Sequence, residues 1–219
     1  MKNAINSKLI EGFKKVSSTT LSDIFDEMDI NGNIIGLNPV IPGVKIVGAA
    51  VTVKAVTGIK GTYHRSDFGK VINLFEMVRK GDVVVFDNMG VPVSGWGGLA
   101  SVAMKQIGVE GLVMDGGVRD IDEIKESGFQ VYARFFTPRS AQTRVKIDSI
   151  NERIQCCGVH VNPGDIIVGD STSIAVVPLS TAESILEKAI ELEEKEEKIR
   201  SELMKGLSFR EASAKYARI

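Results

Sequence analysis

Two glycine-rich segments carry the residues of this sequence that are best suited to chemistry. Residues 95–100 have the sequence GWGGLA and residues 114–120 have the sequence MDGGVRD, and each segment leads into a predicted helix. Unpaired N–H groups at a helix start favour an anion such as a carboxylate or a phosphate. Arg119 adds a planar guanidinium that can donate two hydrogen bonds to a carboxylate, and Asp120 adds a hard oxygen ligand for Mg²⁺ or Mn²⁺. The two segments predict a site for a small anion and a divalent cation.

The spacing between the segments indicates that they meet in space. Twenty residues separate Gly98 from Arg119, which is the length of one helix and one strand. Such a unit returns the chain to the same edge of a sheet, where open α/β sheets place their sites. Residues 95–100 also match a relaxed dinucleotide-binding pattern, but seven residues, one of them a proline, stand where that pattern requires a tight turn. Arg119 and Asp120 are also compatible with an ordinary helix N-cap beside a solvated arginine.

The remaining reactive residue types form no pattern typical of catalysis. Neither His64 nor His160 has a partner at ligand spacing, so neither is assigned a role. The sequence G-x-S-x-G does not occur, which argues against a serine nucleophile on a strand-to-helix turn. The two cysteines, Cys156 and Cys157, are adjacent, so they cannot form an unstrained disulfide with each other and offer no metal-ligand spacing. We expect two reduced thiols in a cytoplasmic protein.

The composition argues against several classes of protein. The 219 residues include 27 Lys and Arg against 28 Asp and Glu, so the net charge of −1 leaves no positive excess to hold a nucleic acid. Hydrophobic residues at 43% and charged residues at 25% are globular rather than disordered proportions. No run approaches the roughly 18 to 20 apolar residues of a membrane span, and residues 1–15 lack the apolar core of a signal peptide. We expect a cytoplasmic protein with neither a nucleic-acid nor a membrane partner.

Hydrophobic patterning predicts the elements that position these segments. Strands are predicted at 44–56 (one strand, or two around Gly48), 83–86, 111–114 and 131–136. Helices are predicted at 8–29 with a break at 17–20, and at 67–79, 99–107 and 120–127. Thr20 or Ser22 is the predicted N-cap of the second helix. The alternation predicts an α/β fold, followed after residue 140 by short strands in a β-rich layer on the same core.

The C-terminal part of the chain is predicted to be a charged helix. Residues 1–180 are predicted to form one α/β domain, and residues 181–219 a helix that packs on this domain or on a neighbouring subunit. Between residues 183 and 202 the helix carries eight Glu against four Lys or Arg. Glu196 falls on its apolar stripe, where a hydrophobic residue is expected. This carboxylate is either part of a solvated face or a charge aimed at a site on a neighbouring surface.

A collinear series of motifs resembles the RraA-like family, which includes the class II 4-hydroxy-4-methyl-2-oxoglutarate and 4-carboxy-4-hydroxy-2-oxoadipate aldolases. The series runs from GDVVV at 81–85 through both glycine-rich segments to VNPGDI at 161–166, AVVP at 175–178 and the Glu-rich helix. The resemblance implies a single domain of mixed β-sheets flanked by helices, related to the swivelling β/β/α fold, with a long C-terminal helix. It also implies a ring-shaped homotrimer or a homohexamer.

The resemblance implies roles for individual residues. Four residues would bind the pyruvoyl part of a 2-oxo acid through backbone amides: Gly97, Gly98, Leu99 and Ala100. Arg119 would contact the substrate and Asp120 would hold a divalent metal cation, Mg²⁺ or Mn²⁺. A neighbouring subunit's C-terminal helix would bring a carboxylate near the metal, for which Glu196 is the candidate. Gly98 stands where the resembling aldolases carry Asp, so the carboxylate that would order the metal's water shell is missing.

These roles imply a metal-dependent lyase of 2-oxo acids. A cation acting as a Lewis acid would stabilise the enolate that forms when substrates of the 4-hydroxy-4-methyl-2-oxoglutarate type cleave to pyruvate. The same enolate forms when oxaloacetate loses CO₂. Some members of the family regulate an RNA-degrading enzyme by protein contact, so the resemblance also implies an alternative, a non-catalytic regulator that binds a ribonuclease or another protein.

Overall fold

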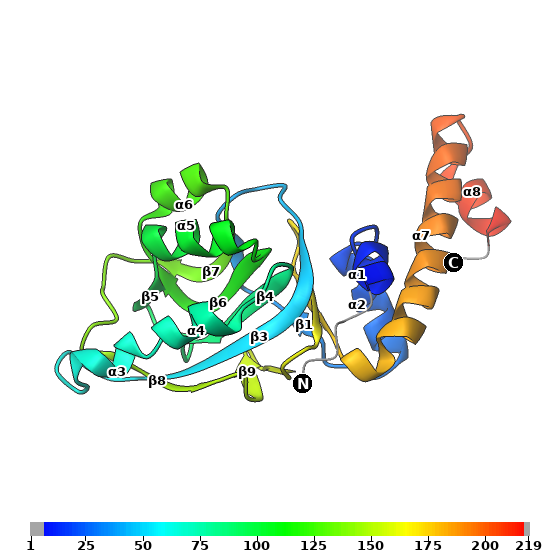
Figure 1. The fold of residues 1–219 in the computed structure, drawn as a ribbon. Coiled ribbons are helices and arrows are strands. Elements are labelled where there is room, and N and C mark those ends of the chain that lie inside the picture. The colour runs from blue at the N-terminus through cyan, green and yellow to red at the C-terminus, as the bar shows by residue number, and fades with distance from the viewer. Residues whose placement is uncertain (1–6, 217–219) are drawn as a thin grey trace.

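A mixed β-sheet forms the centre of the computed structural model, which describes residues 7–216 (Figure 1). Its ten strands follow the order β1-β12-β11-β3-β4-β6-β7-β2, with β5 beside β6 and β8 beside β3. These strands are β1 (Asn33–Ile34), β2 (Asn38–Pro39), β3 (Ile46–Thr57), β4 (Asp82–Asp87), β5 (Ser94–Trp96), β6 (Gly111–Val118), β7 (Gln130–Phe136), β8 (Val145–Ile150), β11 (Ile166–Gly169) and β12 (Ile174–Val177). A separate hairpin consists of β9 (Ile154–Cys156) and β10 (Val159–Val161).

Helices cover the sheet in two groups. The described helices are α1 (Ser7–Phe13), α2 (Ser18–Glu27), α3 (Arg65–Gly69), α4 (Ile72–Met77), α5 (Gly98–Ile107), α6 (Ile121–Ser127), α7 (Ala182–Met204) and α8 (Phe209–Lys215), with a 3₁₀ turn at Leu179–Thr181. Figure 1 shows α4, α5 and α6 at one end of the sheet, and α1, α2 and α7 at the other. The mixed α/β fold with a long C-terminal helix that the sequence predicts is confirmed.

The parallel part of the sheet positions the predicted site. Strands β3, β4, β6 and β7 run parallel, and the chain crosses between them through α3 and α4, then α5, then α6. Residues 83–86 of β4 are fully buried, as expected for a continuous apolar run in a covered parallel sheet. The carboxyl ends of β4 and β6 and the N-termini of α5 and α6 therefore meet at one edge.

Strand β3 joins the parallel part of the sheet to the antiparallel part. Its residues 46–49 pair with β11 and its residues 53–57 pair with β8. The strand continues through Gly48, where an added Cβ would overlap the carbonyl oxygen of Gly81 in the turn before β4. Glycine permits this close approach, so residues 44–56 contain one strand. The predicted β-rich layer is only partly separate, because β8, β11 and β12 extend the central sheet and only the β9–β10 hairpin lies outside it.

Three groups of buried side chains hold these layers together. The first lies between the parallel strands and the helices α4, α5 and α6, and includes Met104. The second lies under the β9–β10 hairpin on the opposite face of the sheet, and includes Val161. The third joins α1, α2 and α7 to β11 and β12, and includes Phe25 and Ile185.

The predictions for the N-terminal and middle helices need correction. The helix predicted at 67–79 is two short helices, since α3 ends at Gly69 and α4 begins at Ile72; glycine is a weak helix former. Helix α2 is capped by Ser17 rather than by Thr20 or Ser22, because the Ser17 side chain accepts a hydrogen bond from the backbone N–H of Thr20 at 3.0 Å.

The strand predicted at 111–114 also needs correction. It continues to Val118, so Gly116 and Gly117 lie in a buried strand and not in a loop. The extension exists because β5 pairs beside it, with Ser94 opposite Gly117 and Trp96 opposite Val118. The glycine-rich segment 114–120 is therefore a strand end that delivers its last two residues to the sheet edge.

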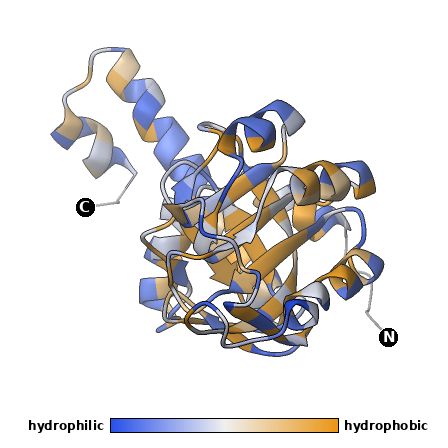
Figure 2. Cartoon of the chain, turned by 90° about the vertical axis from the view of Figure 1, so that its left-hand side faces the viewer, coloured by the Kyte–Doolittle hydropathy of each residue, from blue (hydrophilic) through white to orange (hydrophobic). Residues whose placement is uncertain are grey.

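The C-terminal segment is a helical hairpin and not a single helix. Helix α7 packs on its own chain through Ile185 and Ala189, and α8 returns along it with Lys215 paired to Glu202 at 3.2 Å. Figure 2 shows the C-terminal part of α7 and α8 projecting from the rest of the chain, with hydrophilic and hydrophobic residues mixed along them. The outer limits of the two predicted regions, residues 1–6 and 217–219, lie outside the described residues. Within the described range, no helix has both the length and the apolar character of a membrane span.

Candidate active site

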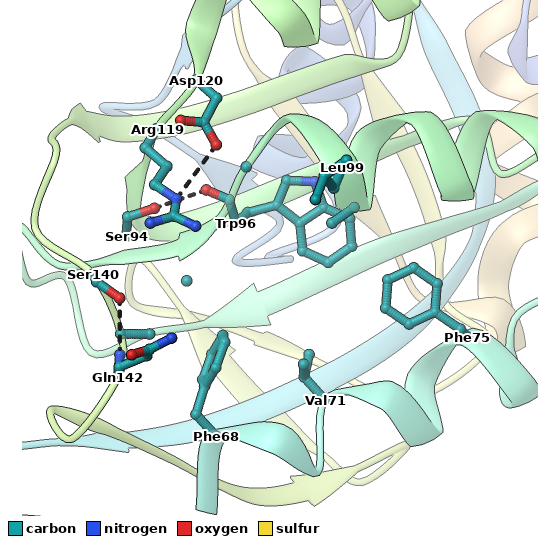
Figure 3. A pocket seen from close by; sticks show the side chains of 14 residues that line it. Phe68, Val71, Phe75, Ser94, Trp96, Leu99, Arg119, Asp120, Ser140 and Gln142 are labelled. Atoms are coloured by element: carbon teal, nitrogen blue, oxygen red, sulfur yellow. Dashed lines mark hydrogen bonds and ion pairs between the residues drawn. The ribbon is translucent and has the colours of Figure 1, made fainter. Parts of the chain in front are cut away.

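A cavity of about 230 Å³ lies at the sheet edge where β5 and β6 end and α5 begins (Figure 3). Its polar lining consists of Ser94, Arg119, Asp120, Ser140 and Gln142. Its apolar lining consists of Phe68, Val71, Phe75, Trp96, Leu99, Ala100 and Ala141. Of the predicted site residues, Gly97, Leu99, Ala100, Arg119 and Asp120 all line this cavity. The structure therefore brings the two segments together as their spacing predicts.

Arg119 and Asp120 occupy the turn between β6 and α6. The backbone N–H of Arg119 donates to the carbonyl oxygen of Trp96 at 3.1 Å, which ties this turn to β5. Asp120 holds the N-cap position of α6 with a φ of 57°, and its side chain makes no capping hydrogen bond. Aspartate tolerates this left-handed backbone better than most residues. Asp120 is thus the N-cap residue by position, as the alternative interpretation has it, but its side chain does not cap the helix and its carboxylate is left for other contacts.

The Asp120 carboxylate faces two donors across the start of the cavity. Its Oδ2 lies 3.3 Å from Nε of Arg119 and accepts a hydrogen bond from the backbone N–H of Gly98 at 3.3 Å (Figure 3). The Arg119 and Asp120 side chains are 49% and 38% exposed, so a ligand in the cavity can reach both. Among the described residues, no hydrogen bond is donated to Oδ1 of Asp120. One oxygen of this carboxylate is thus available to a ligand.

The N-terminus of α5 adds backbone donors beside this carboxylate. Gly97 is the N-cap, and it has no side chain that could cap the helix. The N–H groups of Leu99 and Ala100 belong to the first turn, which has no intrahelical acceptors for them. An added Cβ at Gly97 would lie 2.5 Å from Oδ2 of Asp120. Glycine is therefore what lets the start of α5 approach Asp120 so closely.

Glu123 is a neighbour of the site that the sequence reasoning missed, although it does not line the cavity itself. An added Cβ at Gly98 would overlap Oε2 of Glu123 and would lie 2.7 Å from the Glu123 Cβ. The Glu123 side chain thus fills the space that a side chain at position 98 would take, and it brings a carboxylate beside Gly98. Asp120 and Glu123 are three residues apart at the start of α6, a spacing that places side chains on one face of a helix. This three-residue spacing is the feature of the sequence that could have indicated Glu123.

An aromatic stack forms one wall of the cavity. The Trp96 ring lies 6.2 Å from the Phe75 ring with an interplanar angle of 6°, and 6.4 Å from the Phe129 ring. The indole N–H donates to Oγ of Ser101 at 3.0 Å. Sequence reasoning assigned no role to this wall, although Phe68, Val71 and Phe75 recur at spacings of three and four. The same spacing is equally typical of ordinary core packing.

A second polar group lies on the opposite face of the sheet. Asp115 precedes Gly116 in β6, and its carboxylate lies within 4.8 Å of the sulfur atoms of Cys156 and Cys157. Arg134 donates to Oδ1 of Asp115 at 2.8 Å and to Sγ of Cys157 at 3.1 Å. The sequence offers no metal-ligand spacing around the cysteines, but the fold brings Asp115 to them across 40 residues of sequence, and the three side chains together could hold a metal ion.

The donor set of this second group does not suit Mg²⁺ or Mn²⁺. Both carboxylate oxygens of Asp115 are already hydrogen-bonded, Oδ1 to Arg134 and Oδ2 to the backbone N–H of Cys157 at 2.7 Å. A hydrogen bond with Cys157 and burial raise the pKa of the Cys156 thiol well above its ordinary value. Thiolates are soft ligands that prefer zinc or copper to magnesium. This group is therefore a poor candidate for the predicted hard cation.

Glu196 does not reach Asp120 within one copy of the chain. It lies on α7, which packs at the other end of the sheet from α5 and α6 (Figure 1). Its neighbour on the same helix, Glu193, binds the start of α2 by accepting hydrogen bonds from the Ser17 backbone N–H at 2.8 Å and from Oγ1 of Thr20 at 2.7 Å. Burial alone would raise the pKa of Glu193, but these hydrogen bonds hold it below its ordinary value.

Comparison with known proteins identifies the family. A family model described as RraA-like, aldolase/RraA, matches residues 18–176. The chain belongs to the RraA-like family. An uncharacterized protein from Methanocaldococcus jannaschii is 37% identical over 180 residues, which is 80% of this chain and 82% of that protein.

Two further comparisons carry functional names. A protein of Halalkalibacterium halodurans, named as a candidate 4-hydroxy-4-methyl-2-oxoglutarate aldolase, is 32% identical over 182 residues, 82% of this chain and 81% of that protein. The crystal structure of Streptomyces coelicolor RraAS2, named as an unusual member of the RNase ES inhibitor RraA protein family, has a TM-score of 0.80 at 26% identity and covers 90% of this chain and 98% of that one. The RraA-like family thus contains proteins named as aldolases and proteins named as ribonuclease inhibitors.

Proposed function

We propose that this RraA-like protein is a divalent-metal-dependent lyase of 2-oxo acids. It would cleave substrates of the 4-hydroxy-4-methyl-2-oxoglutarate type to pyruvate, decarboxylate oxaloacetate, or both. The observation that carries the proposal is the convergence of Arg119, the Asp120 carboxylate and the first turn of α5 on one cavity. The aldolase name of the Halalkalibacterium relative supports the same class of reaction.

The residues at this cavity fit a hard divalent cation. Mg²⁺ is held in proteins through one or two carboxylates, and it keeps several waters. Asp120 offers a carboxylate oxygen that no described residue occupies, in a half-exposed position beside the cavity. When bound there, the cation would polarise the 2-keto oxygen of the substrate as a Lewis acid.

The other residues of the cavity hold and orient the substrate. The N–H groups of Leu99 and Ala100, with the positive end of the α5 dipole behind them, bind the carboxylate of the 2-oxo acid. The Arg119 guanidinium stands beside this position and stabilises the negative charge that develops on the keto oxygen as the carbon–carbon bond breaks. Because Gly97 has no side chain, the backbone at the start of α5 can lie next to the side chains of Arg119 and Asp120.

A second copy of the chain completes the proposed site. We assign the carboxylate that the resemblance implies to Glu196 of a neighbouring subunit in a homotrimer or homohexamer. The N-terminal half of α7 packs on its own chain, and its C-terminal part projects from the rest of the chain (Figure 2), which supports a contact between this part and another copy. This assignment predicts that Glu196→Gln lowers turnover while the fold and the oligomeric state stay unchanged.

Pyruvate release tests the proposed function. Wild-type protein and Asp120→Ala are each given oxaloacetate and 4-hydroxy-4-methyl-2-oxoglutarate, with Mg²⁺ or with EDTA. We expect pyruvate release faster than in the same mixture without protein only from wild type with Mg²⁺. Equal traces in every arm would contradict the enzymatic function, and loss with EDTA but full activity in Asp120→Ala would mean that the metal binds elsewhere.

A regulatory function is the alternative, and the similarity to RraAS2 is the observation that favours it. A regulator needs a protein-binding surface and no turnover, and the charged α7–α8 hairpin offers such a surface. Binding of a purified ribonuclease, together with no pyruvate release from either substrate, would favour this alternative over the lyase.

A further inference from the structure

The wall of the cavity opposite Arg119 is apolar. Phe68 and Val71, from the α3–α4 segment, lie across the cavity from the Arg119–Asp120 pair (Figure 3). Phe75 and Trp96 continue the wall toward α5. Apart from Ser140 and Gln142, which lie beside Phe68, this half of the cavity offers carbon surface, and the charged side chains lie in the half formed by the end of β6.

The apolar wall is also rigid and closed to hydrogen bonding. The Trp96 ring is stacked between Phe75 and Phe129, so it is held in one orientation. Its N–H is already donated to Ser101, and the Ser94 hydroxyl nearby is already donated to the Trp96 carbonyl at 2.7 Å. A polar group of a ligand at the Trp96 part of this wall would lose its water and gain no hydrogen bond from either group, which is costly. The polar side chains of Ser140 and Gln142 lie at the Phe68 end of the cavity.

The charges that line the cavity match a single carboxylate. Among the residues that line it, Arg119 is the only cationic side chain. The proposed function places Arg119 and the start of α5 at the 2-oxo acid group. A second carboxylate, at the far end of a substrate, would therefore lie against Phe68, Val71 and Trp96 with no cationic side chain from the same chain to meet it. Burying an unpaired carboxylate is far more costly than burying a methyl group.

We propose that the preferred substrate is a 4-hydroxy-2-oxo acid that has one carboxylate and an apolar substituent beyond C4. This inference rests on the proposed lyase function and narrows its substrates, since 4-hydroxy-4-methyl-2-oxoglutarate and oxaloacetate carry a second carboxylate and would be the poorer substrates. In the reaction the proton of the 4-hydroxyl passes to water, the C3–C4 bond breaks, and its electron pair moves onto the C2 carbonyl oxygen. Protonation of C3 by water then gives pyruvate, and the apolar part leaves as an aldehyde or a ketone.

Binding of two non-cleavable acids tests the proposal without relying on turnover. 2-Oxohexanoate and 2-oxoadipate have the same chain length and differ only in a terminal methyl or carboxylate. Trp96 is the one tryptophan of the chain and lines the cavity, so its fluorescence reports occupancy directly. With Mg²⁺ present, we expect 2-oxohexanoate to bind with a Kd about tenfold lower than that of 2-oxoadipate.

Cationic substitutions on the wall should reverse this preference. Val71→Lys places an ammonium group where the second carboxylate would lie, and Gln142→Lys does so at an exposed rim position that cannot disturb the core. Ile72→Lys is the matched control, since Ile72 is 66% exposed and does not line the cavity. We expect tighter binding of 2-oxoadipate in at least one of the two wall variants and no change in the control.

The outcomes separate this inference from the function on which it rests. If 2-oxoadipate binds to wild type as tightly as 2-oxohexanoate or more tightly, the apolar-substrate proposal is wrong while the 2-oxo acid site stands. If neither acid changes the Trp96 fluorescence or competes with pyruvate, the proposed function itself is wrong. A parallel assay of pyruvate release from 4-hydroxy-2-oxohexanoate and from 4-hydroxy-4-methyl-2-oxoglutarate should follow the same order as the two affinities.

Discussion

Replacing Gly98 with alanine tests whether Glu123 has taken the space at that position. The Gly98 backbone does not require glycine, because its φ lies outside the left-handed region. The cost of a side chain there comes instead from Glu123, whose Oε2 would be overlapped by the new methyl. Rotating the carboxylate away is not sufficient, because the Glu123 Cβ lies 2.7 Å from the new atom and is fixed to the α6 backbone.

The magnitude follows from comparing the substitution with and without Glu123. In the wild-type background we expect Gly98→Ala to lower the free energy of unfolding by about 1 to 3 kcal/mol, the usual cost of forcing a methyl into occupied space. In a Glu123→Ala background the same change should be neutral or stabilising by up to about 1 kcal/mol, since alanine is the better helix former. The coupling energy between the two sites should therefore be about 2 kcal/mol.

Urea unfolding of wild type, both single variants and the double variant measures this coupling. A loss of 2 kcal/mol in a chain of this size should also lower Tm by about 4 to 8 °C. Gly69→Ala is the control, because Gly69 lies in a helix with no atom within 4 Å of an added Cβ and should show no loss. If Gly98→Ala costs the same with and without Glu123, the placement of Glu123 over Gly98 is wrong.

Three further predictions concern stability, substrate binding and thiol chemistry. Asp170 accepts hydrogen bonds from the Ser18 backbone N–H and hydroxyl at 2.7 Å each, so Asp170→Asn should cost about 1 kcal/mol at neutral pH. Burial alone would raise the pKa of Asp170, but the hydrogen bonds from Ser18 hold it below its ordinary value. The contribution of Asp170 to the free energy of unfolding is therefore present above the ordinary carboxyl pKa and is lost as pH falls through the lowered pKa. In thermal melts, the difference in Tm between wild type and Asp170→Asn should therefore shrink below about pH 4. A difference that persists into stronger acid would contradict this. Arg119→Lys should raise KM for a 2-oxo acid about tenfold, because the planar fork is lost, and an unchanged KM in steady-state assays would remove Arg119 from substrate binding. Cys157 should be alkylated before Cys156, as measured by mass spectrometry after brief treatment. Cys156 is fully buried, and its hydrogen bond with Cys157 and its burial both raise the pKa of its thiol. Equal rates of alkylation would contradict the burial of Cys156.

Much of the fold could be predicted because its signals are local. The apolar run at 83–86 has the composition of a doubly covered strand, and it is one. The adjacency of Gly98 and Arg119 follows from the length of one helix and one strand, since a crossover between parallel strands returns the chain to the same edge. These inferences need only the spacing of residues along the chain and the rule for crossovers between parallel strands.

The parts that could not be predicted depend on contacts between distant residues. Two such contacts are that of Glu123 with Gly98 and that of Asp115 with Cys157. In each, the proximity of the two residues depends on how helices, strands and hairpins pack. The aromatic wall of the cavity could not be predicted, because Phe68 and Phe75 have the spacing of ordinary core residues. Only their position beside Trp96 in the structure shows that they line a cavity. The extension of β6 to Val118 depends on its pairing with β5.

Titration of Mn²⁺ followed by electron paramagnetic resonance tests the central claim, that Asp120 holds a divalent cation at this cavity. Asp122→Asn is the matched control, because Asp122 is exposed in the same first turn of α6 and does not line the cavity. We expect wild type and Asp122→Asn to bind Mn²⁺ with equal affinity, and Asp120→Asn to bind it at least about tenfold more weakly. Equal affinity in Asp120→Asn, or no binding by wild type, would contradict the claim.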